Sequence, residues 1–212
     1  AKYWMHNGFV NINGQKMSKS LGNSFFLKDV LKQYNGEVVR FYMLTSSYRI
    51  DFGFSEDDLL SSKKRLDKLY RLKKRLYGIG NGTINKEFKN NILEVLNDDL
   101  NTAKAMAIID EYIALSNDKL DNEPKNKQLK KDIVASIDYL NIILGIGYQD
   151  PFLYFQFGLL DDDKKNIEDL ILQRNNAKKD KNFILSDEIR DQLARMNISL
   201  MDTINGTMWE KL

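Results

Sequence analysis

Two lysines, Lys16 and Lys19, belong to the stretch of this chain whose residue types best suit chemistry on phosphates. The stretch reads Lys-Met-Ser-Lys-Ser from residue 16 to 20, and residues 1–28 contain no Asp or Glu. The local field therefore favours a polyanion. Two ammonium groups at this spacing can contact different oxygens of one triphosphate, while serine hydroxyls and backbone N–H groups bind the others. The pattern predicts a phosphate-binding loop, with a solvated basic turn as the alternative.

A second concentration of charge lies on the helix that we expect to begin after Ser55 and to end near Tyr77. Ser55 is the predicted N-cap, and the acidic residues that follow suit a first turn. Cations crowd one face against a lone Asp67: Lys63, Lys64, Arg65, Lys68, Arg71, Lys73, Lys74 and Arg75. A ridge of one sign favours a phosphate backbone as its partner, and a plain solvated face is the alternative.

Two adjacent carboxylates, Asp98 and Asp99, could serve in acid–base or metal chemistry. No supporting cluster of ligands lies near them in the sequence. Asn101 or Thr102 as the N-cap of the next helix accounts for the stretch more simply, because aspartates are favourable near the positive end of a helix.

Composition excludes several classes of protein. The chain has 212 residues, 42% of them hydrophobic, no cysteine and one histidine, His6. Disulfides, thiol chemistry and a zinc site built from Cys and His are therefore excluded, and we predict no metal site in this chain. The net charge of +2 is too small to indicate nucleic acid by itself, so RNA binding would need local patches. Without a membrane-spanning run or a signal-peptide pattern, we expect a cytoplasmic protein that does not bind membranes.

The elements that must position these residues are mostly helical, as the scarcity of proline favours. Trp4 to Ile12 reads as a strand or extended segment that runs into the lysine stretch, and short helices are expected at 27–34 and 37–44. An extended connector at 46–52 precedes the basic helix, and the three glycines of 78–82 predict a domain boundary.

Beyond residue 82, apolar periodicity predicts helices at 88–96, 101–115 and 129–144, which suggest an antiparallel bundle. Residues 145–158 read as an aromatic linker that packs onto the bundle. Helices at 161–180 and 183–196, a β-like segment at 198–201 and a turn at 204–207 then predict a small α/β tail. In the second of these helices we expect an apolar stripe of Phe183, Leu185, Ile189, Leu193 and Met196.

Two strings carry a resemblance to a known family. The first string runs from Tyr3 to Gln15 and continues through residues 16–20 and Leu21-Gly22-Asn23. It resembles the signature of class I aminoacyl-tRNA synthetases, and is most similar to that of cysteinyl-tRNA synthetases. The C-terminal end of that family is similar to the order Gln173-Arg174, Ala177-Lys178-Lys179, Phe183, Ser186 to Asp191, Leu193, Met196, Ile198, Leu200, Asp202-Thr203, Gly206-Thr207 and Trp209. The resemblance extends over nearly the whole chain.

The resemblance implies a mainly α fold in five parts. These are the end of a Rossmann-type catalytic domain with the KMSKS loop (1–50), a helical stem (51–80), an antiparallel helical bundle (81–147), a linker (148–160) and a small α/β anticodon-binding domain (161–212). The stretch Asp98 to Thr102 resembles a family motif, to which we assign a structural role.

The resemblance also implies site residues. Lys16 and Lys19 would be catalytic and would hold the triphosphate of ATP within the loop Lys16, Met17, Ser18, Lys19 and Ser20, with Met17 as a packing anchor. We expect His6 to pack among aromatic residues, with a contact to substrate or ATP as the alternative.

In the tail, Lys178, Asp187 and Asp202 would contact the bases of the anticodon, since exposed base edges bind carboxylates and basic groups. Lys178 stands where the family often has Arg, which exchanges a bidentate fork for a point charge. We expect Trp209 to be a core residue of this small domain.

As a member of this family the chain would be the C-terminal half of an enzyme that uses ATP with Mg, binds cysteine and tRNA(Cys), and acts as a monomer. Zinc is expected only in the missing N-terminal part, and the fragment alone is expected to be inactive. Two alternatives stay open: a stand-alone tRNA-binding module, and a related ligase that joins cysteine to an amino-sugar inositol but lacks the anticodon-binding tail.

Overall fold

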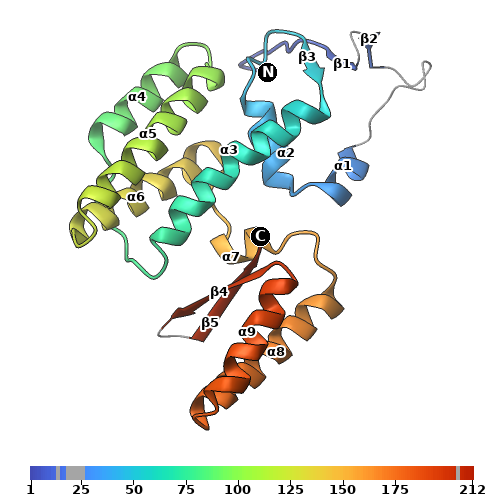
Figure 1. Ribbon diagram of the computed structural model, residues 1–212. Helices are drawn as coiled ribbons and strands as arrows, with labels where there is room; N and C mark the ends of the chain where they lie inside the picture. The colour runs from blue at the N-terminus through green and yellow to red at the C-terminus, as the bar shows by residue number, and fades with distance from the viewer. Residues whose placement is uncertain (13–14, 18–26, 204–205) are drawn as a thin grey trace. The chain divides into compact units, whose positions relative to one another are not determined.

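The computed structural model describes residues 1–12, 15–17, 27–203 and 206–212. The expected mainly α fold is confirmed, with small sheets near both ends of the chain (Figure 1). The chain divides into two compact units, Ala1–Tyr148 and Gln149–Leu212. The five-part division drawn from the sequence stays a prediction. Among the described helices, none is both long enough and apolar enough to cross a membrane.

The first unit begins with a three-stranded sheet in the order β2-β1-β3. Strand β1 (Val10–Ile12) pairs antiparallel with β2 (Gln15–Lys16) and parallel with β3 (Phe52–Phe54). The parallel pair needs a crossover connection, which α1 (Leu27–Gln33) and α2 (Gly36–Leu44) provide. Both helices confirm the prediction, whereas the strand begins at Val10 rather than near Trp4.

Helix α3 (Glu56–Arg75) begins as predicted, because the Ser55 hydroxyl accepts a hydrogen bond from the backbone N–H of Asp58 at 3.3 Å. Its apolar face is fully buried at Leu59, Leu66, Leu69 and Leu72. Two ion pairs join α3 to α5, the second helix after it. The glycine-rich stretch 78–82 lies within the first compact unit and does not separate the two units.

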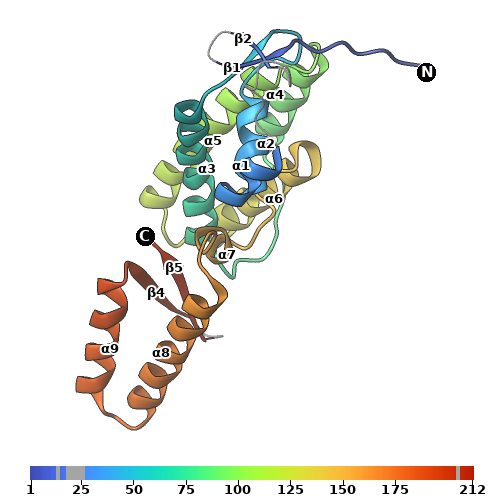
Figure 2. The same ribbon diagram turned by 90° about the vertical axis from the view of Figure 1, so that its right-hand side faces the viewer.

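The bundle consists of α4 (Lys86–Asn97), α5 (Thr102–Asn122) and α6 (Lys127–Leu144), which lie side by side in Figures 1 and 2. Helix α6 ends at Gly145, whose φ of 66° is left-handed. The Arg40 guanidinium donates from Nε to the Leu144 carbonyl at 2.5 Å, so Arg40 has a structural role at the end of α6.

The second unit contains α7 (Pro151–Phe155), α8 (Asp161–Lys179), α9 (Phe183–Arg195) and the antiparallel hairpin β4 (Ile198–Thr203) and β5 (Gly206–Lys211). Helix α7 lies where only a linker was expected. Asp150 accepts from the Phe152 N–H at 2.8 Å, and proline stands in the first turn, so the local capping chemistry favours a helix.

The core of this unit forms where α8 and α9 pack on the hairpin: Ile167, Leu170, Ile171, Ile189, Leu193, Ile198 and Trp209. Trp209 is 5% exposed, which confirms it as a core residue. The expected apolar stripe of α9 is wrong at Phe183, Leu185 and Met196, which are 64%, 41% and 37% exposed. The buried residues of α9 are Ser186, Ile189 and Leu193, which share one face at spacings of three and four, whereas Phe183 and Met196 lie at the two ends of the helix.

Candidate nucleic-acid interface

The backbone that leads into the KMSKS stretch belongs to the small sheet. Lys16 lies in β2 opposite Asn11, and the Met17 N–H donates to the Val10 carbonyl at 2.9 Å. Ser18, Lys19 and Ser20 lie outside the described residues. The catalytic roles of Lys16 and Lys19 therefore stay predictions.

Met17 is half-buried at an apolar cavity of about 110 Å³ between the sheet and the helices α1 and α2. Val10, Val30 and Phe52 also line this cavity. The surroundings of Met17 fit the packing role that the sequence analysis gave it.

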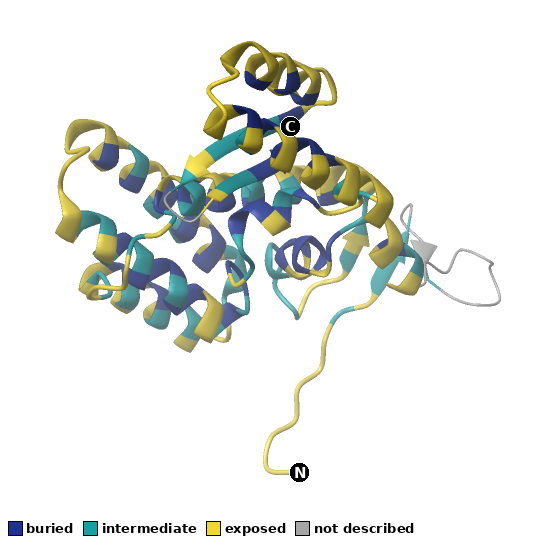
Figure 3. Ribbon diagram, turned by 90° about the horizontal axis from the view of Figure 1, so that it is seen from below, coloured by how far each residue is buried: buried dark blue, intermediate teal, exposed yellow. Residues whose placement is uncertain are grey.

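His6 does not pack among aromatic residues as expected. Residues 1–7 are exposed, and Tyr3 and Trp4 are 88% and 79% exposed (Figure 3). Strand pairing starts only at Val10, so no element of the described chain covers the histidine ring.

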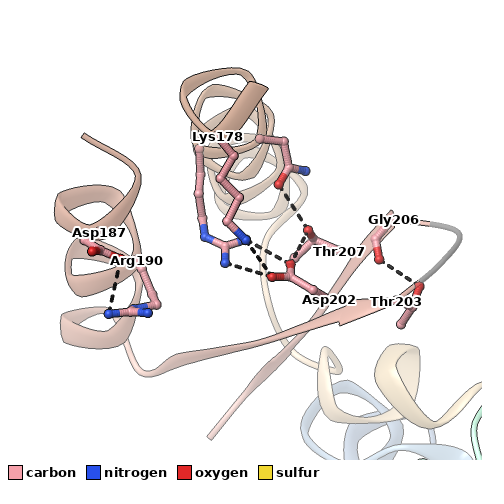
Figure 4. A network of polar contacts seen from close by, with 9 residues as sticks. Lys178, Asp187, Arg190, Asp202, Thr203, Gly206 and Thr207 are labelled. Carbon is pink, nitrogen blue, oxygen red and sulfur yellow. Dashed lines mark hydrogen bonds and ion pairs between the residues drawn. The ribbon is translucent and has the colours of Figure 1, made fainter. Parts of the chain in front are cut away.

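The residues predicted to contact RNA lie in the second unit, and two of them touch. The Lys178 ammonium donates to Oδ2 of Asp202 at 2.7 Å. Arg174 donates to both carboxylate oxygens at 3.0 Å, and the Thr207 hydroxyl donates to Oδ1 at 2.8 Å (Figure 4). Helix α8 supplies the two cations one turn apart, and the hairpin supplies Asp202 and Thr207. We call these four residues the Asp202 cluster.

The Asp202 carboxylate has a donor at each of its acceptor positions. Arg174 and Thr207 donate to Oδ1, while Arg174 and Lys178 donate to Oδ2, and an ionised carboxylate offers about four lone-pair sites. Arg174, followed by Lys178, holds the pKa of Asp202 far below its usual range, against the opposing effect of partial burial. Asp202 is therefore ionised at neutral pH.

Arg174 is the residue of this cluster that sequence reasoning missed. It lies near the end of α8, and its side chain is only 6% exposed. Arg174 follows Ile167, Leu170 and Ile171 at helical spacing, so it lies on their buried face. This helical spacing is the feature of the sequence from which the burial of Arg174 could have been predicted.

Asp187, the third predicted RNA contact, does not join the cluster. It lies on α9, is 63% exposed, and pairs with Arg190 one turn later at 3.3 Å (Figure 4). Its carboxylate is accessible, whereas that of Asp202 is held by neighbouring donors.

Much of the basic face of α3 is occupied by contacts within the first unit. Arg65 donates to Asp110 at 2.8 Å, Arg75 pairs with Asp121, and Lys73 donates to the Gly147 carbonyl at 2.5 Å. These cations fasten α3 to α5 and to the end of the bundle. Lys64 and Lys68 are exposed. The basic residues of α3 therefore fall into two groups: cations that hold the first unit together and cations that are accessible to a partner.

Asp99 has a structural role rather than a part in a metal site. It accepts from the Tyr48 hydroxyl at 2.7 Å and from Nη2 of Arg49 at 2.9 Å, and Arg49 also donates from Nε. Hydrogen bonds from Arg49 and then Tyr48 lower the pKa of Asp99 to about 2. Asn101 is the N-cap of α5 and accepts from the Lys104 N–H at 3.1 Å, as predicted.

Comparisons with known proteins show which families this chain is similar to. The family model of the tRNA synthetases class I (C) catalytic domain matches residues 1–64, and the model of the DALR domain matches residues 91–149. A solved structure, the ternary complex of Agrobacterium radiobacter K84 agnB2 LeuRS with tRNA and LeuAMS, has a TM-score of 0.56 at 18% identity, and the match covers 66% of this chain and 20% of that one. This structure supports the fold alone.

Curated relatives match over the whole chain. The cysteine–tRNA ligase of Aliarcobacter butzleri (strain RM4018) is 62% identical over 212 residues, which are 100% of this chain and 45% of that protein. The enzyme of a Nitratiruptor species is 58% identical over 100% of this chain and 46% of its own length. That of Helicobacter pylori (strain J99 / ATCC 700824) is 54% identical over 100% of this chain and 45% of its own. The chain, which thus spans about half the length of these relatives, belongs to the cysteine–tRNA ligase family of class I aminoacyl-tRNA synthetases.

Proposed function

We propose that this chain supplies the KMSKS stretch and the tRNA-binding parts of an enzyme that activates cysteine with ATP and transfers it to tRNA(Cys). The observation that carries the proposal is the 62% identity to a cysteine–tRNA ligase across all 212 residues. In the activation step, the carboxylate of cysteine attacks the α-phosphorus of ATP, and negative charge develops on the departing pyrophosphate. Lys16 and Lys19 would hold the triphosphate and offset that charge, which requires cations positioned in advance.

In the second unit, Lys178, Asp187 and Asp202 would contact the anticodon. Lys178 is 39% exposed and Asp187 63% exposed, so both can meet RNA without a change in packing. Asp202 already holds four donors, and therefore accepts from a base amino group only when one donor, most readily the ammonium of Lys178, turns to the RNA.

Magnesium would arrive with ATP as part of the substrate. Among the described residues no group of three His, Cys, Asp or Glu side chains could hold a metal ion, and the whole sequence has no cysteine, so these residues do not fit a zinc site. The zinc expected in this family would be held by a part of the enzyme outside this chain. The enzyme would act as a monomer in the cytoplasm, where tRNA is charged for protein synthesis.

The affinity of the chain for tRNA(Cys), compared at one fixed salt concentration with the same tRNA carrying a swapped anticodon, tests the role of the second unit. We expect the swap to weaken binding about tenfold or more, equivalent to about 1.4 kcal/mol. Equal binding that collapses with added salt would show a surface that only binds phosphates.

Cysteine-dependent exchange of pyrophosphate into ATP, measured on the full-length protein that carries this chain, tests the activation step. Exchange with cysteine followed by charging of tRNA(Cys) supports the proposal. Binding of tRNA without exchange favours a stand-alone tRNA-binding module, and transfer of activated cysteine to an amino-sugar inositol instead of tRNA favours the related ligase.

A further inference from the structure

The connector between α2 and β3, residues 46–51, is held from two sides by parts of the first unit that are distant in sequence. On one side lies the corner between α4 and α5. Asp99 in this corner accepts from Tyr48 and Arg49, and the Thr102 hydroxyl donates to the Ser46 carbonyl at 3.1 Å.

The corner has a defined backbone conformation. Asp99 and Leu100 have φ of 51° and 54°, a left-handed conformation that aspartate tolerates and leucine rarely adopts. The Leu100 N–H donates to Leu96 and the Asn101 N–H donates to Val95, both at 3.1 Å, so the corner is tied to the end of α4. The Asp99 side chain is thus presented to the connector by a turn that is hydrogen-bonded to the end of α4.

On the other side, the connector is bound by the segment that becomes β1. The Gly8 N–H donates to the Tyr48 carbonyl at 2.8 Å, and the Phe9 N–H donates to the Asp51 carboxylate at 2.8 Å. A Cβ at Gly8 would overlap the carbonyl of Ile50, so the two backbones approach as closely as only glycine allows.

Strand β1 continues this chain of contacts toward the KMSKS stretch. Asn11 pairs with Lys16 across the antiparallel ladder, and the Met17 N–H donates to Val10. The contacts therefore run without a gap from the bundle corner, through the connector and β1, to the backbone of the first two KMSKS residues.

We propose that Asp99 is a positioning residue for cysteine activation: by fixing Tyr48 and Arg49, it sets the place of the β1–β2 pair from which the KMSKS stretch continues. This inference rests on the proposed function, since it assigns the stretch to ATP. In this proposal Asp99 acts through the connector and not by contact with substrate or ATP.

The test uses Asp99→Asn in the full-length protein that carries this chain. Asparagine keeps the tolerance for left-handed φ but loses the charge-assisted pair with Arg49. We expect kcat/KM for ATP in pyrophosphate exchange to fall about tenfold. The KM for cysteine and the midpoint of thermal unfolding should stay unchanged, because an exposed ion pair contributes little to stability.

A double-mutant cycle tests whether Asp99 acts through its contact with Arg49. Arg49→Lys alone should reduce the same parameter, and adding it to Asp99→Asn should give little further loss, since both changes break one contact. Asp121→Asn is the matched control: it removes an exposed partner of Arg75 that joins α3 to α5 without contacting the connector, and it should leave exchange unchanged.

Unchanged exchange in Asp99→Asn, or additive losses in the cycle, would overturn the inference. So would a loss of exchange accompanied by a lower unfolding midpoint, because that would indicate a merely structural role. If the unmutated full-length protein shows no cysteine-dependent exchange, the proposed function itself fails, which distinguishes the two failures.

Discussion

Replacing Asp202 by asparagine should destabilise the second unit, because it leaves the Arg174 guanidinium buried without its counter-charge. Removing one partner of a buried ion pair costs about 3–5 kcal/mol. The Arg174 side chain is 6% exposed but that of Asp202 is 49% exposed, so solvent reduces the cost, and we expect about 2 kcal/mol.

Urea unfolding followed by the fluorescence of Trp209 measures this loss, since Trp209 lies in the core of the second unit. The other tryptophan, Trp4, is 79% exposed and can be replaced by phenylalanine in every variant. With a slope of about 1 kcal/mol/M for so small a unit, the midpoint should fall by about 2 M.

The effect depends on pH in a defined direction. The pKa of Asp202 is lower in the folded than in the unfolded state, so its stabilisation is fully present above the unfolded pKa of about 3.9 and is lost as the pH falls toward the folded value. The difference in unfolding free energy between the original chain and the variant should be largest at pH 7 and should shrink progressively below about pH 4.

Asp187→Asn is the matched control, because it breaks an exposed pair on the same unit and should cost less than about 0.5 kcal/mol. If Asp202→Asn costs no more than this control, or if the difference at pH 7 persists unchanged at pH 3, Arg174 does not need Asp202 and the reasoning about the cluster is refuted.

Two further changes test the first unit. Gly8→Ala should lower its unfolding free energy by about 1–3 kcal/mol, because the new methyl group would overlap the Ile50 carbonyl; Gly53→Ala, with nothing within 4 Å of the added Cβ, should have little effect in the same thermal unfolding experiment. Replacing both exposed lysines of α3, Lys64 and Lys68, by alanine should reduce the slope of log affinity for tRNA against log salt by about 1 for each phosphate that is no longer neutralised, and an unchanged slope would show that α3 does not meet the RNA.

Local signals in the sequence predicted the elements well. Ser55 and Asn101 cap the helices that they were expected to cap, and Trp209 lies in the core. Each of these predictions depends on a few neighbouring residues, whose side chains bond to the nearest backbone or continue an apolar period.

Contacts between distant residues could not be predicted in the same way. The cations of α3 formed one ridge in the sequence, and only the packing of α3 against α5 brings Arg65 to Asp110 and Arg75 to Asp121. Charge patterning along one helix says nothing of the counter-charges on another, so the division between structural and accessible cations appears only in three dimensions.

The contact between Lys178 and Asp202 affects what the second unit can recognise. A phosphate offers only acceptors: it could take the ammonium of Lys178 from Asp202, but it would then stand beside the negative charge of that carboxylate, which repels it. A base edge that carries a donor next to an acceptor can replace both halves of the Lys178–Asp202 contact, accepting from the ammonium and donating to the carboxylate. The counter-charge that weakens this lysine as a phosphate binder therefore favours base edges over backbone, which is the preference that the proposed contact with the anticodon would require.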